Sequence, residues 1–215
     1  TKNPEEKPYF LTNQSAGSFN TFKHSFEAGT GKFLNNLLSV SARYSIINSD
    51  GYIDRAFSKL NSYNINALFE KGNTKLRFLT FGGKEKTYQA WNGIDKATYE
   101  SNPKFNYSGA IYDANWENII GFYDNETDNY RQNHYHLLWE QKLGKIWNLE
   151  TTFHLTHGEG YYENYKQDAK FSKYDLPNIV ENGNTITRTD FIRKKWLDND
   201  FYGVVSNLYG NFENV

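Results

Sequence analysis

The chain has 215 residues, of which 18% are aromatic, yet its mean hydropathy is only −0.81. Few soluble cores combine so many bulky rings with so few aliphatic side chains, whereas membrane β-barrels do, because aromatic girdles surround a polar lumen. The net charge of −1 comes from 24 basic and 25 acidic residues without a block of one sign, so nucleic acid is not expected as a partner.

Two further absences narrow the class of protein. Cysteine is absent, which excludes a disulfide framework, a thiolate metal site and a thiol nucleophile. No apolar run approaches the ~20 residues that a membrane-spanning helix requires. The chain contains no methionine and opens at Thr1 without a signal-peptide pattern, so we expect a processed or excised piece of a protein.

Alternation of apolar and polar side chains predicts the secondary structure. Residues 1–17 hold two of the four prolines and show no period, so they are predicted to form a loop. The clearest alternation covers residues 38–48, where one face is apolar and the other carries serine and Arg43. Leu79 and Phe81 interrupt the pattern of their strand. The seven predicted strands are residues 21–28, 38–48, 60–70, 75–82, 134–143, 147–158 and 201–212.

The connections between these strands alternate between short and long. The first, third and fifth are short, and two of the others are long irregular excursions, residues 83–133 and 159–199. Outer-membrane barrels have this arrangement, with tight periplasmic turns and long outer loops. A soluble binding sandwich, which can also gather loops at one end, is the alternative.

The sequence therefore predicts an all-β fold, an antiparallel up-and-down transmembrane β-barrel. At about 30 residues per strand, an eight-stranded barrel needs roughly 240 residues and a 22-stranded barrel roughly 660. The chain would be nearly all of a small barrel or about a third of a large one. Because Val215 is not the terminal aromatic residue common in complete barrels, we expect residues 1–215 to be about seven strands of a larger, 22-stranded barrel.

Several passages of the chain resemble the barrel domain of TonB-dependent outer-membrane receptors, in particular those of Bacteroidetes-type bacteria. They occur in order and span nearly the whole chain. The passages are residues 17–21 (GSFNT), 49–55 (SDGYIDR), 81–93 (FGGKEKTYQAWNG), 122–139 (FYDNETDNYRQNHYHLLW), 157–165 (HGEGYYENY) and 193–203 (RKKWLDNDFYG).

This resemblance implies a receptor that imports a scarce nutrient, such as an iron chelate, a cobalamin-like cofactor or a glycan, across the outer membrane of a Gram-negative bacterium. The implied partners are outer-membrane lipid, a small-molecule or glycan ligand on the extracellular side, and TonB. TonB acts through a plug domain and a short box, and neither is visible in this sequence. The alternative is a small closed barrel or a soluble β module that binds a partner through the same loops.

The long loops contain the candidate ligand-binding residues, because aromatic and hydrogen-bonding side chains suit a polar ligand. The alternative for each residue is a structural role in packing the loop on its neighbours. The candidates are Lys86, Tyr88, Gln89, Trp91, Asn92, Trp116, Tyr123, Tyr161 and Tyr162.

His136 and His154 raise the question of a metal site. A turn centred on Lys145 would place them opposite each other, ~5 Å apart, on the polar face. Two imidazoles without a third ligand are a weak metal signal, so we expect them to line a wet lumen and expect no metal. His157 belongs to the other face.

Nothing in the sequence indicates catalysis or a cofactor. The carboxylates Glu159 and Glu163 lie in a predicted irregular acidic stretch and have no evident orienting partner. The segment Gly158-Glu159-Gly160 is not followed by the Lys-Ser/Thr of a phosphate-binding loop. We therefore expect a protein that is not an enzyme.

Overall fold

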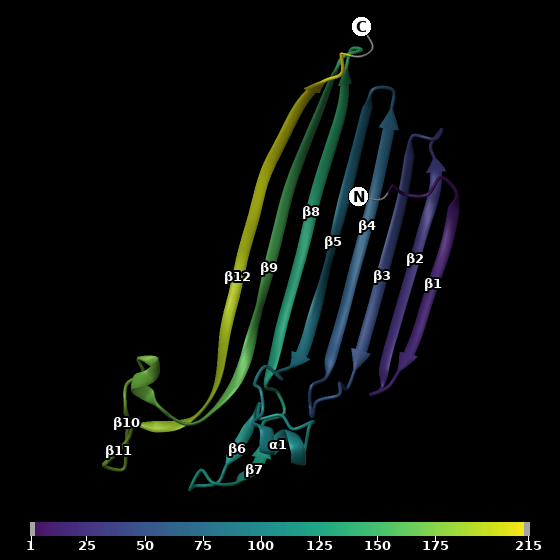
Figure 1. Ribbon diagram of the computed structural model, residues 1–215. Coiled ribbons are helices and arrows are strands. Elements are labelled where there is room, and N and C mark those ends of the chain that lie inside the picture. The colour runs from purple at the N-terminus through teal and green to yellow at the C-terminus, as the bar shows by residue number, and fades with distance from the viewer. Residues whose placement is uncertain (1–2, 213–215) are drawn as a thin grey trace.

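The computed structural model describes residues 3–212, which form mainly antiparallel β-strands (Figure 1). Eight strands make one curved sheet in the order β1-β2-β3-β4-β5-β8-β9-β12. The strands of the main sheet are β1 (Pro8–Gly17), β2 (Thr21–Phe33), β3 (Leu38–Ser49), β4 (Ser58–Lys71), β5 (Thr74–Tyr88), β8 (Thr127–Leu143), β9 (Trp147–Lys170) and β12 (Arg188–Gly210).

The remaining elements belong to the two longest connections. The connection from β5 to β8 contains the helix α1 (Lys96–Ser101) and the hairpin of β6 (Ala110–Tyr112) and β7 (Ile119–Phe122). The connection from β9 to β12 contains the 3₁₀ helix η1 (Phe171–Tyr174) and the hairpin of β10 (Ile179–Glu181) and β11 (Asn184–Ile186). Within residues 3–212, neither helix has the length and apolar character needed to cross a membrane.

The predicted separation of short and long connections is confirmed. The turns after β2, β4 and β8 lie at one end of the sheet, and α1 and both hairpins lie at the other (Figure 1). The β4–β5 turn has two residues, and Gly72 adopts φ 58° at its first central position. A positive φ there matches the right-handed twist of the strands and is accessible to glycine without steric cost.

The N-terminal segment corrects one prediction, because residues 8–17 form a strand and not a loop. β1 pairs with β2 without interruption from Pro8 opposite Thr30 to Gly17 opposite Thr21. Its interior is a polar run, residues 12–15, so the sequence shows no apolar period, and only pairing with β2 supplies the strand. The main sheet therefore has eight strands instead of seven.

The predicted strand ends are a second correction. β5, β8, β9 and β12 continue well into the stretches predicted as loops, so the two long connections shrink to residues 89–126 and 171–187. In these extensions, both faces of the sheet carry polar and aromatic residues. The backbone ladder continues there although the apolar alternation has ended.

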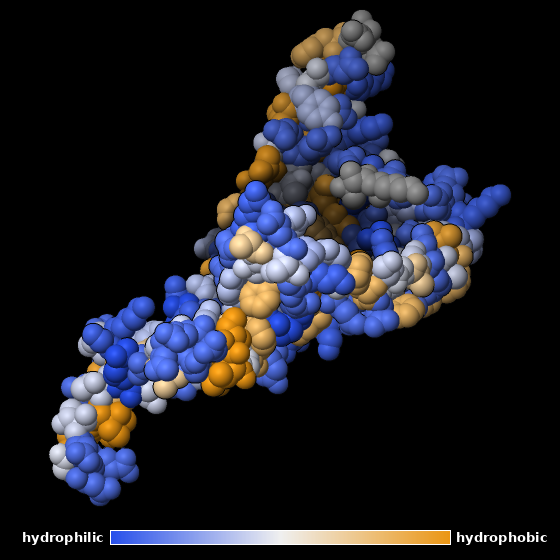
Figure 2. All heavy atoms as spheres, turned by 60° about the horizontal axis from the view of Figure 1, so that its bottom comes forward, coloured by the Kyte–Doolittle hydropathy of each residue, from blue (hydrophilic) through white to orange (hydrophobic). Residues whose placement is uncertain are grey.

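The sheet closes on neither side within residues 3–212, where β1 and β12 form its two edges and do not pair with each other. This arrangement differs from a small closed barrel. Figure 2, which looks towards the loop end, shows the wall curving around a hollow.

The strand register sorts the side chains into two faces. One row runs Ile65, Thr80, Tyr135, Leu155 across β4 to β9, and most of its apolar side chains are exposed, Ile65 by 39%. The opposite, concave face holds buried polar side chains, which are Ser39, Ser45, Asn66 and Arg77. The convex face also carries the remaining apolar residues predicted to share a face, Tyr44, Ile46, Tyr63, Leu137, Trp139 and Phe153.

Leu79 and Phe81, which interrupt the alternation of their strand, lie on the concave face. Their register partners are Asn66 and Asn64 on β4 and two histidines on β8. Phe81 stacks on His134 with ring centroids 4.4 Å apart. Phe81 therefore packs against the rings of His134 and His136 on the concave face, and the two faces of the strand keep their orientation.

Glycines in the strands are covered by aromatic rings from the neighbouring strand. The directly paired sets are Tyr9 with Gly29, Tyr130 with Gly160 and His154 with Gly203. A Cβ added to Gly160 would lie 2.2 Å from the Asn129 carbonyl oxygen. The segment Gly158-Glu159-Gly160 is thus strand backbone that makes room for Tyr130, in accord with the ability of aromatic neighbours to stabilise a glycine in a sheet.

Candidate functional site

The long connections gather at one end of the sheet and form the candidate site (Figure 1). Its foundation is a group of buried polar side chains, which we call the loop anchor. The loop anchor comprises Arg55, Tyr88, Gln89, Asn106, Glu126 and Asn164.

Gln89 stands where β5 ends and is only 3% exposed. Its Nε2 donates to the carbonyl oxygens of Thr127 and Glu163, at 3.2 and 3.0 Å, and its Oε1 accepts from Asn164 Nδ2 at 2.8 Å. One side chain therefore ties the end of β5 to both β8 and β9. Because a buried amide must satisfy its donors and acceptor, these contacts fix its position.

Glu126 closes the same network from the other end of the connection. Its Oε1 accepts from Asn164 Nδ2 at 2.9 Å, and its Oε2 accepts from the backbone N–H of Tyr165 at 2.8 Å. The backbone N–H of Gln89 donates to the Glu126 carbonyl oxygen at 2.8 Å. The first and last residues of the 89–126 connection are thus held together and to β9.

A second layer of the loop anchor holds the middle of the connection. Asn106, 2% exposed, donates through Nδ2 to the carbonyl oxygens of Gln89 and Asp54, at 2.9 and 3.1 Å. The Tyr88 hydroxyl donates to the Tyr123 carbonyl oxygen at 2.6 Å. Arg55 places its guanidinium 3.6 Å from the centre of the Phe122 ring and donates to the Asn106 carbonyl. The β3–β4 connection therefore supports the longer one.

Glu163 is a further junction on the outer side of the anchor. It accepts from the Tyr123 hydroxyl at 2.5 Å and from Asn125 Nδ2 at 2.6 Å, and Lys194 lies 3.3 Å away. Burial and the hydrogen bond to Glu163 raise the pKa of the Tyr123 hydroxyl to about 12, so it remains a donor at physiological pH. Glu159 pairs with Arg131. Both carboxylates lie on β9 with defined partners, which corrects their predicted irregular setting.

The residues predicted to bind ligand occupy several places. Tyr88, Gln89 and Tyr123 belong to the buried junctions described above, and Lys86 donates to Asn125 at 2.8 Å. These four have structural partners. Their contact with a ligand stays a prediction.

The other candidates lie nearer the surface. Trp91 is 60% exposed and meets the Tyr162 ring edge-on at 5.6 Å, with exposed Asn92 beside it. Tyr161 packs on Trp196 of β12 at 4.5 Å. Trp116 lies apart, stacked on Tyr112 at 5.7 Å in the β6–β7 hairpin. The structure therefore brings Trp91 and Tyr162 together and separates them from Trp116.

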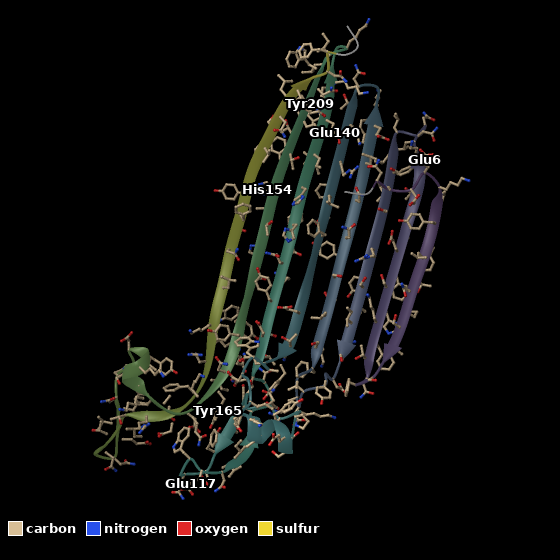
Figure 3. All side chains as sticks on the ribbon, in the orientation of Figure 1. Glu6, Glu117, Glu140, His154, Tyr165 and Tyr209 are labelled. Atoms are coloured by element: carbon tan, nitrogen blue, oxygen red, sulfur yellow. The ribbon has the colours of Figure 1, made fainter. Side chains whose placement is uncertain are left out.

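A cavity of about 440 Å³ opens between the β6–β7 hairpin and the outer end of β9, and we call it the loop cavity. Gln167 joins its two walls, because it accepts from the Tyr112 N–H at 2.8 Å and donates to the Tyr112 carbonyl oxygen at 2.7 Å. Tyr165 and the hairpin tip residue Glu117 mark this end in Figure 3. The lining residues are Ala110, Tyr112, Trp116, Tyr165, Lys166, Gln167, Asp168, Ala169, Lys170, Lys173, Tyr174 and Arg188.

The lining of the loop cavity is basic and aromatic. It holds four cations, Lys166, Lys170, Lys173 and Arg188, against one carboxylate, Asp168, which pairs with Arg188 at 3.0 Å. Such a surface suits an anionic ligand with flat apolar parts. Of this lining, the sequence prediction named only Trp116. The lysines at positions 166, 170 and 173 were a usable signal, but only the fold shows which hairpin faces them.

The predicted pairing of His136 with His154 is confirmed by the register, and their ring centroids are 6.3 Å apart. His134 lies 6.2 Å from His136 and shares a hydrogen bond with Thr156 at 2.8 Å. Figure 3 shows His154 far from the loop end. In the described chain, residues 3–212, no three side chains form a group able to hold a metal ion.

A comparison with protein-family models gave no match, and a comparison with curated proteins gave none either. Among solved structures, the chain is similar to the ferric-catecholate import receptor Fiu of E. coli K12 in its closed form, with a TM-score of 0.63 and 12% sequence identity. The similarity covers 99% of this chain and 30% of that receptor. The chain has the fold of part of a β-barrel wall. It spans less than a third of that receptor's length, and at this identity the likeness concerns the fold.

Proposed function

We propose that the chain is part of the barrel of a TonB-dependent outer-membrane receptor of the Bacteroidetes type, which imports a scarce nutrient. The observation that carries the proposal is the arrangement of the long connections. They gather at one end of a barrel wall, are fixed there by the loop anchor, and enclose a basic, aromatic cavity. The likeness of the fold to an import receptor supports the same reading.

The two faces of the sheet suit a wall between lipid and a polar interior. The convex face presents exposed apolar rows, which include Tyr44 and Trp139 and suit contact with lipid. The concave face is polar and would enclose a plug domain, through which TonB acts. The unpaired edges β1 and β12 require further strands, because a lipid environment leaves no open ladder groups.

Among the nutrients considered, an anionic iron chelate fits the loop cavity best. Arg188 is paired with Asp168, but Lys166, Lys170 and Lys173, together with the rings of Tyr112, Trp116 and Tyr174, suit a negatively charged ligand with flat groups better than a neutral glycan. The chelate would bind on the extracellular side of the protein and be imported across the outer membrane.

The topology is tested by proteolysis of intact cells that carry the protein. Trypsin added outside is expected to cut within residues 89–126 and 171–187, where Lys96 is 88% exposed at its side chain. It should spare Lys145 in the β8–β9 turn, which would face the periplasm. Cleavage at Lys145 with intact loops would reverse the orientation and contradict the proposal.

The ligand class is tested by charge reversal in the loop cavity. Lys173→Glu should weaken binding of an anionic ferric chelate by about tenfold or more, because it replaces an attractive charge by a repulsive one. Binding of radiolabelled ferric chelates to intact cells measures the effect. Lys145→Glu in the turn at the far end is the matched control. Equal affinity in both variants would exclude the loop cavity as the binding site.

A further inference from the structure

Four cations lie together on the convex face of the sheet, away from the loop cavity. Lys59 of β4 is directly opposite Lys86 of β5, and Lys84 of β5 is directly opposite Arg131 of β8. We call these four residues the basic patch. Direct cross-strand neighbours have Cβ atoms about 4.5–5.5 Å apart, and like charges in this position destabilise a sheet.

The register places the basic patch just beyond the apolar band. Lys84 follows Thr80 by four residues, and Lys59 precedes Ile65 by six, so both share the face of the Ile65 row. At about 3.4 Å per residue these positions lie roughly 13–20 Å along the strands from Ile65. With a strand tilt of about 40°, their depth is roughly 10–15 Å from mid-band, the level of the lipid headgroups.

The row between the basic patch and the Ile65 row is already partly polar. Tyr63 and Asn133 flank Gly82 in that row, and the Tyr63 hydroxyl donates to Asn133 Oδ1 at 3.0 Å across the glycine. This row lies two residues, or about 5 Å in depth, from the Ile65 row, and its polar groups satisfy each other inside the apolar band. Polar character therefore increases from the Ile65 row towards the basic patch.

The protein neutralises only one charge of the basic patch. Arg131 pairs with Glu159, whereas Lys86 donates to the neutral amide of Asn125 and Lys59 lies 5.3 Å from the centre of the Phe57 ring. In the described part of the chain, no carboxylate forms an ion pair with Lys59, Lys84 or Lys86. Glu159 lies directly opposite Arg131 on β9, so the basic patch ends at β8.

We infer that the basic patch binds the phosphate groups of an anionic lipid in the outer leaflet, whose acyl chains lie along the adjacent apolar rows. Each phosphate offers several acceptor oxygens, which suit clustered lysine and arginine donors. A lipid is favoured over a free anion because the patch adjoins the apolar band on the same face. The inference rests on the membrane placement of the proposed function, but not on its nutrient.

The test compares lipid retention by the purified protein containing this chain and by a variant with Lys59, Lys84 and Lys86 all changed to glutamine. Native mass spectrometry would follow bound lipid A and its dephosphorylated form. Each basic contact near an anionic surface contributes about fivefold, so the triple variant should retain phosphorylated lipid A roughly 100-fold less. The dephosphorylated lipid should bind the two proteins equally and weakly.

The matched control changes Lys71, Lys142 and Lys145 to glutamine at the turn end, and should leave retention unchanged. Heat-modifiable mobility in gels confirms that each variant is folded. Equal retention by the triple variant would overturn the inference, and so would displacement of the lipid by millimolar inorganic phosphate. A Lys59→Gln, Lys84→Gln variant, which keeps Lys86 and its bond to Asn125, should bind the ferric chelate as the native protein does. If the native protein retains lipid A but does not bind the ferric chelate, the proposed nutrient is refuted and the lipid inference stands.

Discussion

Replacing Ile65 by arginine is expected to lower the free energy of unfolding in lipid vesicles by about 2–4 kcal/mol. Ile65 lies in the middle row of the convex face, between the rows of Tyr63 and Ala67, and is 39% exposed. If this row faces lipid, the arginine must place its charge in hydrocarbon or distort the bilayer to reach water. The cost should decrease towards zero for arginine placed nearer either interface. Unfolding by denaturant in vesicles of defined thickness provides the measurement.

The neighbouring position supplies the control for this prediction. Asn64 points to the concave face, where it lines a polar cavity of about 380 Å³ together with Arg43 and Glu27. Asn64→Arg introduces the same charge one residue away, into a hydrated space, and should cost little. If the two substitutions cost the same, Ile65 does not face lipid, and the membrane placement of the wall fails at that row.

Replacing Glu126 by alanine is expected to release the 89–126 connection from the barrel wall. The change removes the side-chain acceptor of the Tyr165 backbone N–H and that of one N–H of the Asn164 amide, which keeps its bond to Gln89, at a site where Glu126 is 7% exposed. A buried donor without a partner costs about 1–3 kcal/mol, so two of them should lower the local stability by about 2–6 kcal/mol. Hydrogen exchange of residues 89–126 should accelerate accordingly, and ligand affinity should decrease because the cavity wall is no longer fixed.

Asp124→Ala is the matched control. Asp124 lies two residues before Glu126 and carries the same charge, but its side chain is exposed. It should leave hydrogen exchange of the connection unchanged. Glu126→Gln should be intermediate, because it keeps one acceptor oxygen. Equal protection in the Glu126→Ala variant and the native protein would mean that Gln89 and Asn106 hold the connection without the carboxylate.

The prediction of the fold succeeded where one face of a strand is apolar. Apolar and polar residues alternate in β3, in β4 and in the halves of β8 and β9 next to the short turn that joins them. The alternation arises because successive side chains of an extended strand point to opposite faces, and only one of these faces is in contact with an apolar environment. The short turns were also predictable. The Asn182-Gly183 pair, with φ 50° and 77°, is a sequence signal for the β10–β11 hairpin.

Other features depend on contacts between segments far apart in the sequence. β1 is polar in its interior and becomes a strand through its backbone pairing with β2. The roles of Gln89 and Glu126 depend on Asn164, which lies 75 and 38 residues away along the chain. Composition suggested that Gln89 could contact a ligand, which stays a prediction, and the structure shows that Gln89 and Glu126 hold the connection in place.

The sequence by itself determined the fold class, the two faces of the wall and the end at which the long connections gather. These properties are local, since each arises from the spacing of side chains along one extended strand or from the length of one connection. Tertiary structure alone decided which loop residues are buried, where the loop cavity opens and that Lys59, Lys84, Lys86 and Arg131 form one patch. The physical reason is register: it fixes which residues of separate strands meet, and no single strand encodes it.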